Sequence, residues 1–331
     1  MLKYIVKRLL LSVVILLGVS LIIYVLIRCM PVSFVDQKVS ALQSNSSFDQ
    51  TAVDKMKEMY GLTDDSFVGI LKGYGNWLLA LCRFDFGKSF VYGVPVLSKI
   101  VDHMWISFAV AIIATVFEFL IAIPLGITAA THQYSIRDYV VTIFVMIGIS
   151  LPSFFFGQML KDWFAVKLGW FPSFGMAEAG TVHGSVMDML LDYLAHMVLP
   201  ILTVVILSIG GRMRMTRTNM LEVLNSDYIR TARAKGLSET VVIYKHAFRN
   251  TLIPLVTSLA GLLPSLFSGA IITEQVFNLD GIGNVAYKAM IQADIPFIMG
   301  YNMFLALLSV IGVLLADLMY AVVDPRVKLT A

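Results

Sequence analysis

Long apolar runs alternate with short polar segments along this chain of 331 residues. A helix that crosses a bilayer needs about 20 mostly apolar residues. Six runs come close to that length or exceed it, and they predict six transmembrane helices at residues 9–27, 106–130, 139–166, 195–209 with its flanks, 253–273 and 298–323. Prolines lie within or beside several runs and predict kinked membrane helices, at Pro124, Pro152, Pro200 and Pro264.

Composition supports the same class. The chain is 58% hydrophobic and 14% charged, with a mean hydropathy of +0.81, which excludes a soluble domain of this length. We therefore predict an all-α polytopic membrane protein. Two cysteines, Cys29 and Cys82, exclude a disulfide framework and a four-cysteine metal site. We expect both outside the cytoplasm, either bridged or as two free thiols.

The distribution of Lys and Arg predicts the orientation, because basic residues concentrate in cytoplasmic segments. If the N-terminus is cytoplasmic, the inner segments hold most of the basic residues and few acids. These basic residues are Lys3, Lys7, Arg8, Arg137, Arg212, Arg214, Arg217, Arg230, Arg233, Lys235, Lys245, Arg249, Arg326 and Lys328. The segment 28–103 is acid-rich by comparison. Both termini are therefore expected to be cytoplasmic.

The outer segment after the first span is long. It contains the loop-like SNSSFDQ, a helical pattern at 52–60 and an amphipathic stretch at 70–82 that is too short to cross a bilayer. It is either a small extracytoplasmic subdomain or a lid on the helix ends. The predicted domains are 1–103 (first helix and outer segment), 104–325 (a five-helix core with the loop 212–252) and a cytoplasmic tail at 326–331.

The polar interval 225–254 is the part around which the second half is organised. Ser226 and Asp227 suit an N-cap and first turn, and Gly236 suits the residue that ends a helix begun at Tyr228. Ser238 offers a second cap, followed by a second helix at 240–249. The pattern predicts helix, tight turn and helix.

One face of the first loop helix carries little side chain. Ala232 and Gly236 are four residues apart, and Arg230, Arg233 and Lys235 flank them. A small surface with a basic rim favours docking over catalysis. The alternatives are a solvated positive-inside loop and a DNA-binding helix-turn-helix. The DNA-binding alternative is disfavoured because a loop held at a bilayer by both ends cannot enter a major groove.

Catalytic and ligand-binding motifs are missing from the sequence. The FGKS run at 86–89 lacks the first glycine of a phosphate loop, because Cys82 stands there. The five histidines do not show the i, i+4 spacing of a helical zinc site, and no nucleophile elbow occurs. We expect no nucleotide, metal or other cofactor to bind this chain.

Two acids lie inside apolar runs, Glu118 and Asp317, and such residues are functional candidates by default. They form either a proton or cation path or structural, cavity-lining groups. The second interpretation is favoured because neither acid has an obvious basic partner in another predicted span.

The loop run DYIRTARAKGLS resembles the cytoplasmic coupling loop, or EAA loop, of ABC importer permeases, in the wording of the oligopeptide and dipeptide branch. Arg230 and Thr231 occupy the first two places of the general motif, Ala232 and Gly236 keep its alanine and glycine, and Phe248–Arg249 replace its Leu-Pro. The resemblance extends over almost the whole chain, through MLKYIVKRLL, YGLTDD, FDFGKSF, SLPSFFFGQML, FAVKLGWFPSFG, HMVLPILT, EQVFNLDGIG and VVDPRVKL. One departure is MPVSFV, where a Pro-Gly-Asp-like phrase is expected.

The resemblance implies a type I ABC importer permease fold and a non-catalytic subunit in the bacterial plasma (inner) membrane. It implies a second homologous permease, two cytoplasmic ATPases that hold ATP and Mg, an extracytoplasmic peptide-binding protein and a peptide substrate. The implied coupling residues are Asp227, Tyr228, Arg230, Thr231, Ala232, Arg233, Ala234, Lys235, Gly236 and Leu237. Related permeases carry nickel or metal chelates. Alternatives of other classes are a proton-coupled carrier that uses Glu118 and Asp317, and a membrane receptor or scaffold.

Overall fold

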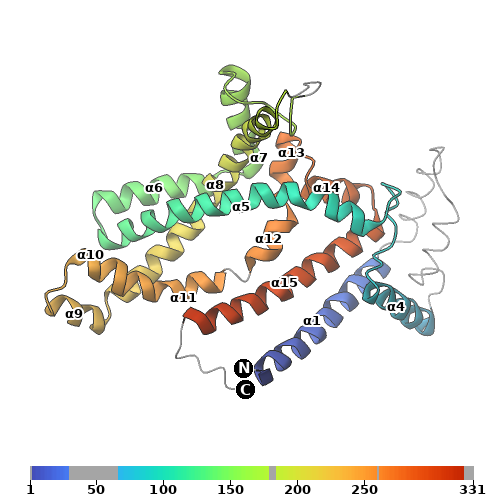
Figure 1. The fold of residues 1–331 in the computed structure, drawn as a ribbon, viewed down its shortest axis with the longest axis horizontal. Helices are drawn as coiled ribbons and strands as arrows, with labels where there is room; N and C mark the ends of the chain where they lie inside the picture. Colours follow the sequence, from blue (N-terminus) through green and yellow to red (C-terminus); the bar gives the residue numbers. More distant parts are fainter. Residues whose placement is uncertain (1, 30–65, 179–183, 259–260, 324–331) are drawn as a thin grey trace. The chain divides into compact units, whose positions relative to one another are not determined.

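The structure is a computed structural model that describes residues 2–29, 66–178, 184–258 and 261–323 (Figure 1). In order, its helices are α1 (Leu2–Arg28), α4 (Phe67–Cys82), α5 (Val96–Thr131), α6 (Ile136–Ser150), α7 (Ser153–Leu160), η1 (Lys161–Lys167), α8 (Val186–Leu224), α9 (Asp227–Ala234), α10 (Glu239–Val241), η2 (Val242–Phe248), α11 (Arg249–Ser258), α12 (Leu262–Ser268), α13 (Ile271–Phe277), α14 (Ile282–Ile291) and α15 (Ile295–Val323). No strand forms within these ranges, so the all-α prediction is confirmed there. The segments SNSSFDQ, 52–60, MPVSFV and 326–331 lie outside the described residues.

Four described helices are long and apolar enough to cross a membrane. They are Val6–Leu26 within α1, all of α5, all of α8, and Ile295–Asp317 within α15. A fifth crossing results if α6 and the helix formed by α7 and η1, which meet at a bend of 101°, count as one span. The first, second, fourth and sixth predicted spans therefore correspond to single helices in the structure.

The prediction of one helix over 139–166 is wrong. The helix α6 ends at Ser150, Leu151 is extended (φ −84°, ψ 132°), and Pro152 precedes α7. Proline disfavours the helical conformation in the residue before it and has no N–H to donate, so the chain turns sharply instead of kinking within a helix.

The prediction of one helix over 253–273 is also wrong. Three shorter helices occupy this stretch: α11, α12 and the start of α13. Between α12 and α13 lies Gly269, whose φ of +72° is incompatible with a continuing helix. A side chain there would lie 2.5 Å from the backbone N of Gly283, so the break allows a close approach of two backbones.

The chain divides into two compact units, one made chiefly of Met1–Trp105 and Val285–Ile311 and the other chiefly of Ile106–Asn284. In the first unit α4 packs on α1. Tyr24 stacks on Trp77 at a ring distance of 6.1 Å, and the Oγ of Ser20 lies 2.8 Å from the hydroxyl of Tyr74. The amphipathic stretch predicted at 70–82 is therefore a helix, with its apolar face against the first membrane helix.

A buried acid at the start of α15 organises the FGKS segment of the same unit. The carboxylate of Asp294 accepts hydrogen bonds from the Oγ of Ser89, from the backbone N–H groups of Phe90 and Val91, and from the N–H of Phe297. Burial raises the pKa of this carboxyl above its ordinary value, and the hydrogen bonds oppose that shift. This segment is therefore a structural loop fastened to the N-terminus of α15.

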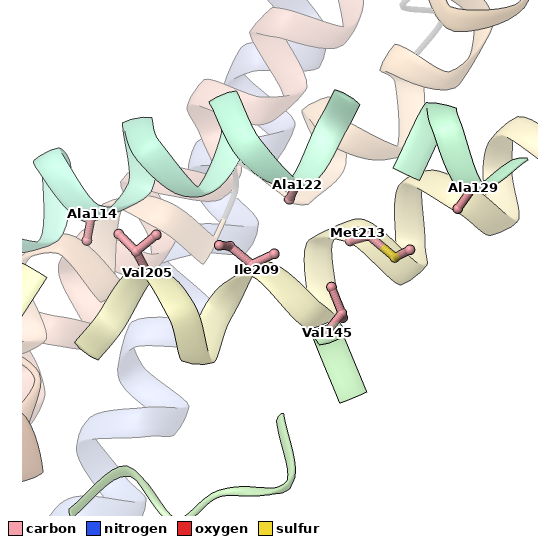
Figure 2. Packing of buried hydrophobic residues seen from close by; sticks show 7 residues of the cluster. All are labelled: Ala114, Ala122, Ala129, Val145, Val205, Ile209 and Met213. Carbon is pink, nitrogen blue, oxygen red and sulfur yellow. The ribbon is translucent and has the colours of Figure 1, made fainter. Parts of the chain in front are cut away.

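In the second unit, small residues of α5 line up along α8 (Figure 2). Ala114, Ala122 and Ala129 face Val205, Ile209 and Met213 of α8, with Val145 of α6 beside them. Small side chains let membrane helices approach closely, where dispersion contacts and not solvent exclusion hold them together. The pair α5–α8 is thus the central helix pair of this unit.

Gly126→Ala tests this seam, because a Cβ there would lie 2.7 Å from the Thr216 Cβ and 2.9 Å from the Met213 carbonyl oxygen. We expect a loss of about 1–3 kcal/mol in stability, as for overpacking in general. The measurement is the thermal unfolding of the detergent-solubilised protein. Gly211→Ala is the matched control, since a Cβ on this α8 glycine meets nothing within 4 Å. Equal effects of both variants would contradict the close approach.

Candidate functional site

The loop predicted as helix, turn and helix is confirmed as such. The helix α9 begins at Asp227 after Ser226 and ends at Ala234, and Gly236 turns the chain with a φ of +78°. The second helical stretch begins at Glu239 and passes through α10 and η2 into α11. Ser226 occupies the N-cap position without capping, because its Oγ donates to the Val223 carbonyl oxygen at 2.6 Å. We call residues 225–249 the elbow.

The elbow has its own apolar core and is fixed to the long helices. Ile229 of α9 and Val242 and Ala247 of η2 are completely buried, and they pack with Met220 of α8. Ile127 and Ala130 at the end of α5 complete the cluster. Burying a side chain the size of isoleucine stabilises a fold by about 1.5–3 kcal/mol. The elbow is therefore rigidly connected to α5 and α8.

The bare strip predicted from Ala232 and Gly236 is wrong for Ala232. Its side chain is 6% exposed and belongs to the core of the elbow, because it lies on the same side of α9 as Ile229. Gly236 is exposed, and a Cβ built there meets nothing within 4 Å. Small size at position 232 thus serves internal packing, whereas Gly236 serves the left-handed turn.

The opposite face of α9 is exposed and basic. Tyr228 is 48% exposed and Leu237 is 40% exposed. The other predicted coupling residues are also exposed: Asp227, Arg230, Thr231, Arg233 and Ala234 in α9, and Lys235, which like Leu237 follows the end of the helix. Arg233 pairs with Glu239 at 2.8 Å and Arg230 with Asp227 at 3.7 Å, but exposed pairs contribute little stability. The large side chains of Tyr228 and Leu237, surrounded by exposed charged side chains, suit binding to another protein.

Behind the elbow, Glu118 of α5 forms an ion pair with Arg212 of α8. The Nε of Arg212 lies 3.0 Å from Oε1 of Glu118, and its Nη1 donates to the Oγ of Ser258 in α11 at 2.6 Å. The expectation that Glu118 has no basic partner in another span is therefore wrong. The pairing was missed because the predicted fourth span ended at 209, whereas α8 includes Arg212 and continues for about three turns beyond it.

A second acid–arginine pair joins α6 to α8. Arg217 donates from Nε and Nη2 to the two carboxylate oxygens of Asp138, at 2.9 and 2.7 Å. Asp138 is 3% exposed and also accepts the backbone N–H of Tyr134. The sequence analysis missed this pair, although an acid and an arginine at the ends of neighbouring apolar runs signal it.

Asp317, the other candidate acid, lies in α15 and is partly buried.

Glu274 of α13 is a further buried acid that the sequence analysis missed. It is 1% exposed and accepts hydrogen bonds from the Oγ of Ser107 at 2.6 Å and from the N–H groups of Asn284 and Ala270. A Cβ at Gly281 would lie 2.5 Å from its carboxylate. The phrase EQVFNLDGIG is therefore a compact turn folded around its own glutamate.

The described part of the chain contains no group of three or more His, Cys, Asp or Glu residues that could hold a metal ion. Cys29 and Cys82 are both free and exposed in the structure.

A family model described as "Binding-protein-dependent transport system inner membrane component" matches residues 122–329. The chain belongs to this family. The match covers the seam of α5 and α8 from Ala122 onward and the whole elbow.

Relatives match this permease over its full length. The oligopeptide transport system permease protein AppB of Bacillus subtilis is 36% identical over 99% of this chain and 100% of its own. The dipeptide transport system permease protein DppB of Alkalihalophilus pseudofirmus is 32% identical over 99% and 100%. The resemblance drawn from the sequence is thus confirmed.

A solved structure shares the fold of this permease. A chain of the methionine ABC transporter MetNI, in an inward-facing conformation, matches with a TM-score of 0.51 over 69% of this chain and 97% of that chain, at 18% identity. The predicted ABC importer permease fold is confirmed.

A double-mutant cycle on Glu118→Gln and Arg212→Met tests the buried pair, whose side chains are 12% and 14% exposed. We expect each single change to cost about 2–4 kcal/mol, because it leaves its partner uncompensated, and the double variant to cost clearly less than the sum. The measurement is the free energy of unfolding of the detergent-solubilised protein.

The control cycle uses Asp227→Asn and Arg230→Met, the exposed pair on α9, for which we expect coupling close to zero. Strictly additive losses at Glu118 and Arg212 would show that their proximity contributes nothing.

Proposed function

We propose that this permease is the transmembrane subunit of an ATP-driven importer of oligopeptides or dipeptides. The proposal is supported by the names of its full-length relatives, which are peptide transport permeases from several bacteria. The family description places such chains in the inner membrane. In the proposed orientation the elbow and both termini face the cytoplasm, as the distribution of Lys and Arg predicts.

The proposed division of labour leaves this chain without a catalytic role. A second homologous permease completes the pathway, two cytoplasmic ATPases bind and hydrolyse ATP with Mg, and an extracytoplasmic protein delivers the peptide. The exposed residues of α9 and of the turn after it bind a groove of one ATPase, through Tyr228, Leu237 and the basic side chains around them.

The observation that carries the proposal is the two-sided construction of the elbow. One side of α9 is exposed for a partner, and the other, with Ile229 and Ala232, is packed against the ends of α5 and α8. A displacement of the ATPase therefore moves the long helices instead of bending a loop. Alternating access follows when rigid helices rotate about a fixed solute site.

The connection continues above the elbow. Arg212 joins α8 to α5 through an ion pair with Glu118 and to α11 through a hydrogen bond to Ser258, so a displacement of the elbow reaches three helices through one arginine. Partly buried pairs of this kind have discrete arrangements, which favours switching between states over gradual deformation.

Experiments can distinguish this proposal from two alternatives. A nickel or metal-chelate permease would share this architecture and differ in its delivered solute. A proton-coupled carrier would use Glu118 and Asp317, and in the structure Glu118 is already engaged in an ion pair with Arg212. Reconstitution of the chain alone separates the classes, since we expect no transport without the ATPases.

Two alanines on α9 provide a matched test of the docking face. With Cys29 and Cys82 replaced by serine, we expect Ala234→Cys to crosslink to an ATPase subunit in the assembled transporter. Ala232→Cys should react slowly, because position 232 is buried in the elbow whereas position 234 is exposed. The measurement is crosslinked product on gels, with and without ATP.

Failure of Ala234→Cys to reach any ATP-hydrolysing partner, in a complex that still transports peptide, would remove the elbow from its proposed role. Peptide accumulation by vesicles that contain this chain alone would overturn the division of labour.

A further inference from the structure

A large cavity lies near the start of α8, at the end of the helix remote from the elbow. Its volume is about 840 Å³, within the range of small-molecule sites. It is formed by the segment 169–178 that follows η1, by the first turns of α8 and by Asn278 after α13, all within the second unit. None of the roles proposed above uses it.

One wall of the cavity is aromatic and held in place. Trp170 is 64% exposed and Phe174 is 66% exposed, which leaves large ring faces open, and Phe171 lies between them in sequence. The backbone N–H of Trp170 donates to the Phe164 carbonyl oxygen at 2.9 Å, and the two rings pack at 5.7 Å. At the other end of the segment, the N–H of Gly175 donates to the carbonyl oxygen of Phe277 at 2.9 Å.

The lining of the cavity also includes two carboxylates, Glu178 and Asp192. Asp192 is fixed by two neighbours: its Oδ2 accepts the N–H of Glu178 at 2.9 Å, and its Oδ1 lies 3.0 Å from Nδ1 of His196. No Lys or Arg is among the described residues that line the cavity. The electrostatic potential inside therefore favours cations.

His196 adds an acceptor. Its side chain is 4% exposed, and its Nδ1 lies 2.8 Å from the Asp192 backbone oxygen as well as 3.0 Å from Oδ1. Both neighbours are acceptors, so Nδ1 carries the hydrogen, and in the neutral ring Nε2 is then left as an acceptor.

The length of α8 places the cavity and the elbow on opposite sides of the membrane. The helix has 39 residues, which corresponds to roughly 58 Å at about 1.5 Å per residue, well beyond the bilayer core of about 30 Å. Asp192 and His196 lie near its first residue, and the elbow follows its last. With the elbow in the cytoplasm, the cavity faces the side from which solute is delivered.

We propose that this cavity binds the protonated amino group of the transported peptide as it enters the permease. An ammonium group has three N–H donors and is attracted both by carboxylates and by aromatic faces, and Glu178, Asp192, His196 and Trp170 supply these partners. This inference rests on the proposed function, since it assigns a site to the solute of that importer.

The test measures the cavity directly in the complex of permeases and ATPases without the binding protein. In a background with Cys29 and Cys82 replaced by serine, Ser173→Cys in the cavity wall is labelled with a cationic and an anionic methanethiosulfonate of similar size. We expect the cationic reagent to react at least about tenfold faster, and Glu178→Gln to reduce that preference about threefold to tenfold. Asp188→Asn, one turn earlier on α8 and exposed, is the matched control and should change the ratio by less than twofold.

Solute protection gives the second readout. We expect millimolar trialanine to slow labelling of Ser173→Cys at least threefold, N-acetyl-trialanine to leave it unchanged, and Trp170→Leu to weaken the protection. Ala177→Cys is a second reporter on the same cavity, so a local effect of one cysteine is recognised.

Each contrary result overturns the inference. Equal rates for the two reagents at both reporters exclude a cation site, and equal protection by both peptides excludes the amino group as its ligand. Protection by the binding protein alone assigns the cavity to protein docking. Peptide uptake by the same complex with its binding protein is measured in parallel, so a failed labelling test in an active importer leaves the proposed function intact.

Discussion

The packing of α9 against the ends of α5 and α8 is the contact on which the rest of the second unit depends functionally. If Ile229 and Val242 were not buried against α5 and α8, the elbow would be a flexible segment of two short helices. An isolated helix of eight residues has little stability of its own in water, so α9 owes its order to this cluster. The mechanical stiffness of the loop is therefore a property of hydrophobic burial and not of its caps, since Ser226 does not cap.

Arginines placed along α8 tie the neighbouring helices to it. Arg212 holds Glu118 of α5 and Ser258 of α11, and one further turn along, Arg217 holds Asp138 of α6. Ionic groups in such surroundings are costly unless paired, and both pairs have short, direct hydrogen bonds. Helix α8 is thus held to its neighbours by an apolar seam of small and aliphatic side chains and by two acid–arginine pairs toward its C-terminal end.

Much of this architecture could be predicted from residue patterns. The all-α class, four of the six spans and the elbow followed from apolar run length and from Ser, Asp and Gly at helix ends. The broken spans were missed for a physical reason: an apolar run shows burial or lipid contact but not continuity, which Leu151 and Gly269 decide through their backbone conformations. The burial of Ala232 was missed because the helical periodicity of α9 shows which residues share a face. It does not show which of the faces packs against the rest of the protein.

The buried acids were missed for a similar reason. Glu274 and Asp294 lie in polar phrases that read as loops, and only tertiary contacts bring Ser107 and Ser89 to them. The sequence shows which groups can ionise, but their partners are far away along the chain. Charge counting also treated Arg212 as part of a basic segment and so did not pair it with Glu118 of α5.

Pro200 in α8 has a consequence for the turn that precedes it. Proline has no N–H, so the carbonyl of His196, four residues earlier, lacks its usual helical donor. The helical ladder is therefore interrupted between the turn that carries Asp192 and the long remainder of α8. The first turns of α8, which line the cavity with Asp192 and His196, are therefore less tightly coupled to the rest of the helix than an uninterrupted hydrogen-bond ladder would make them.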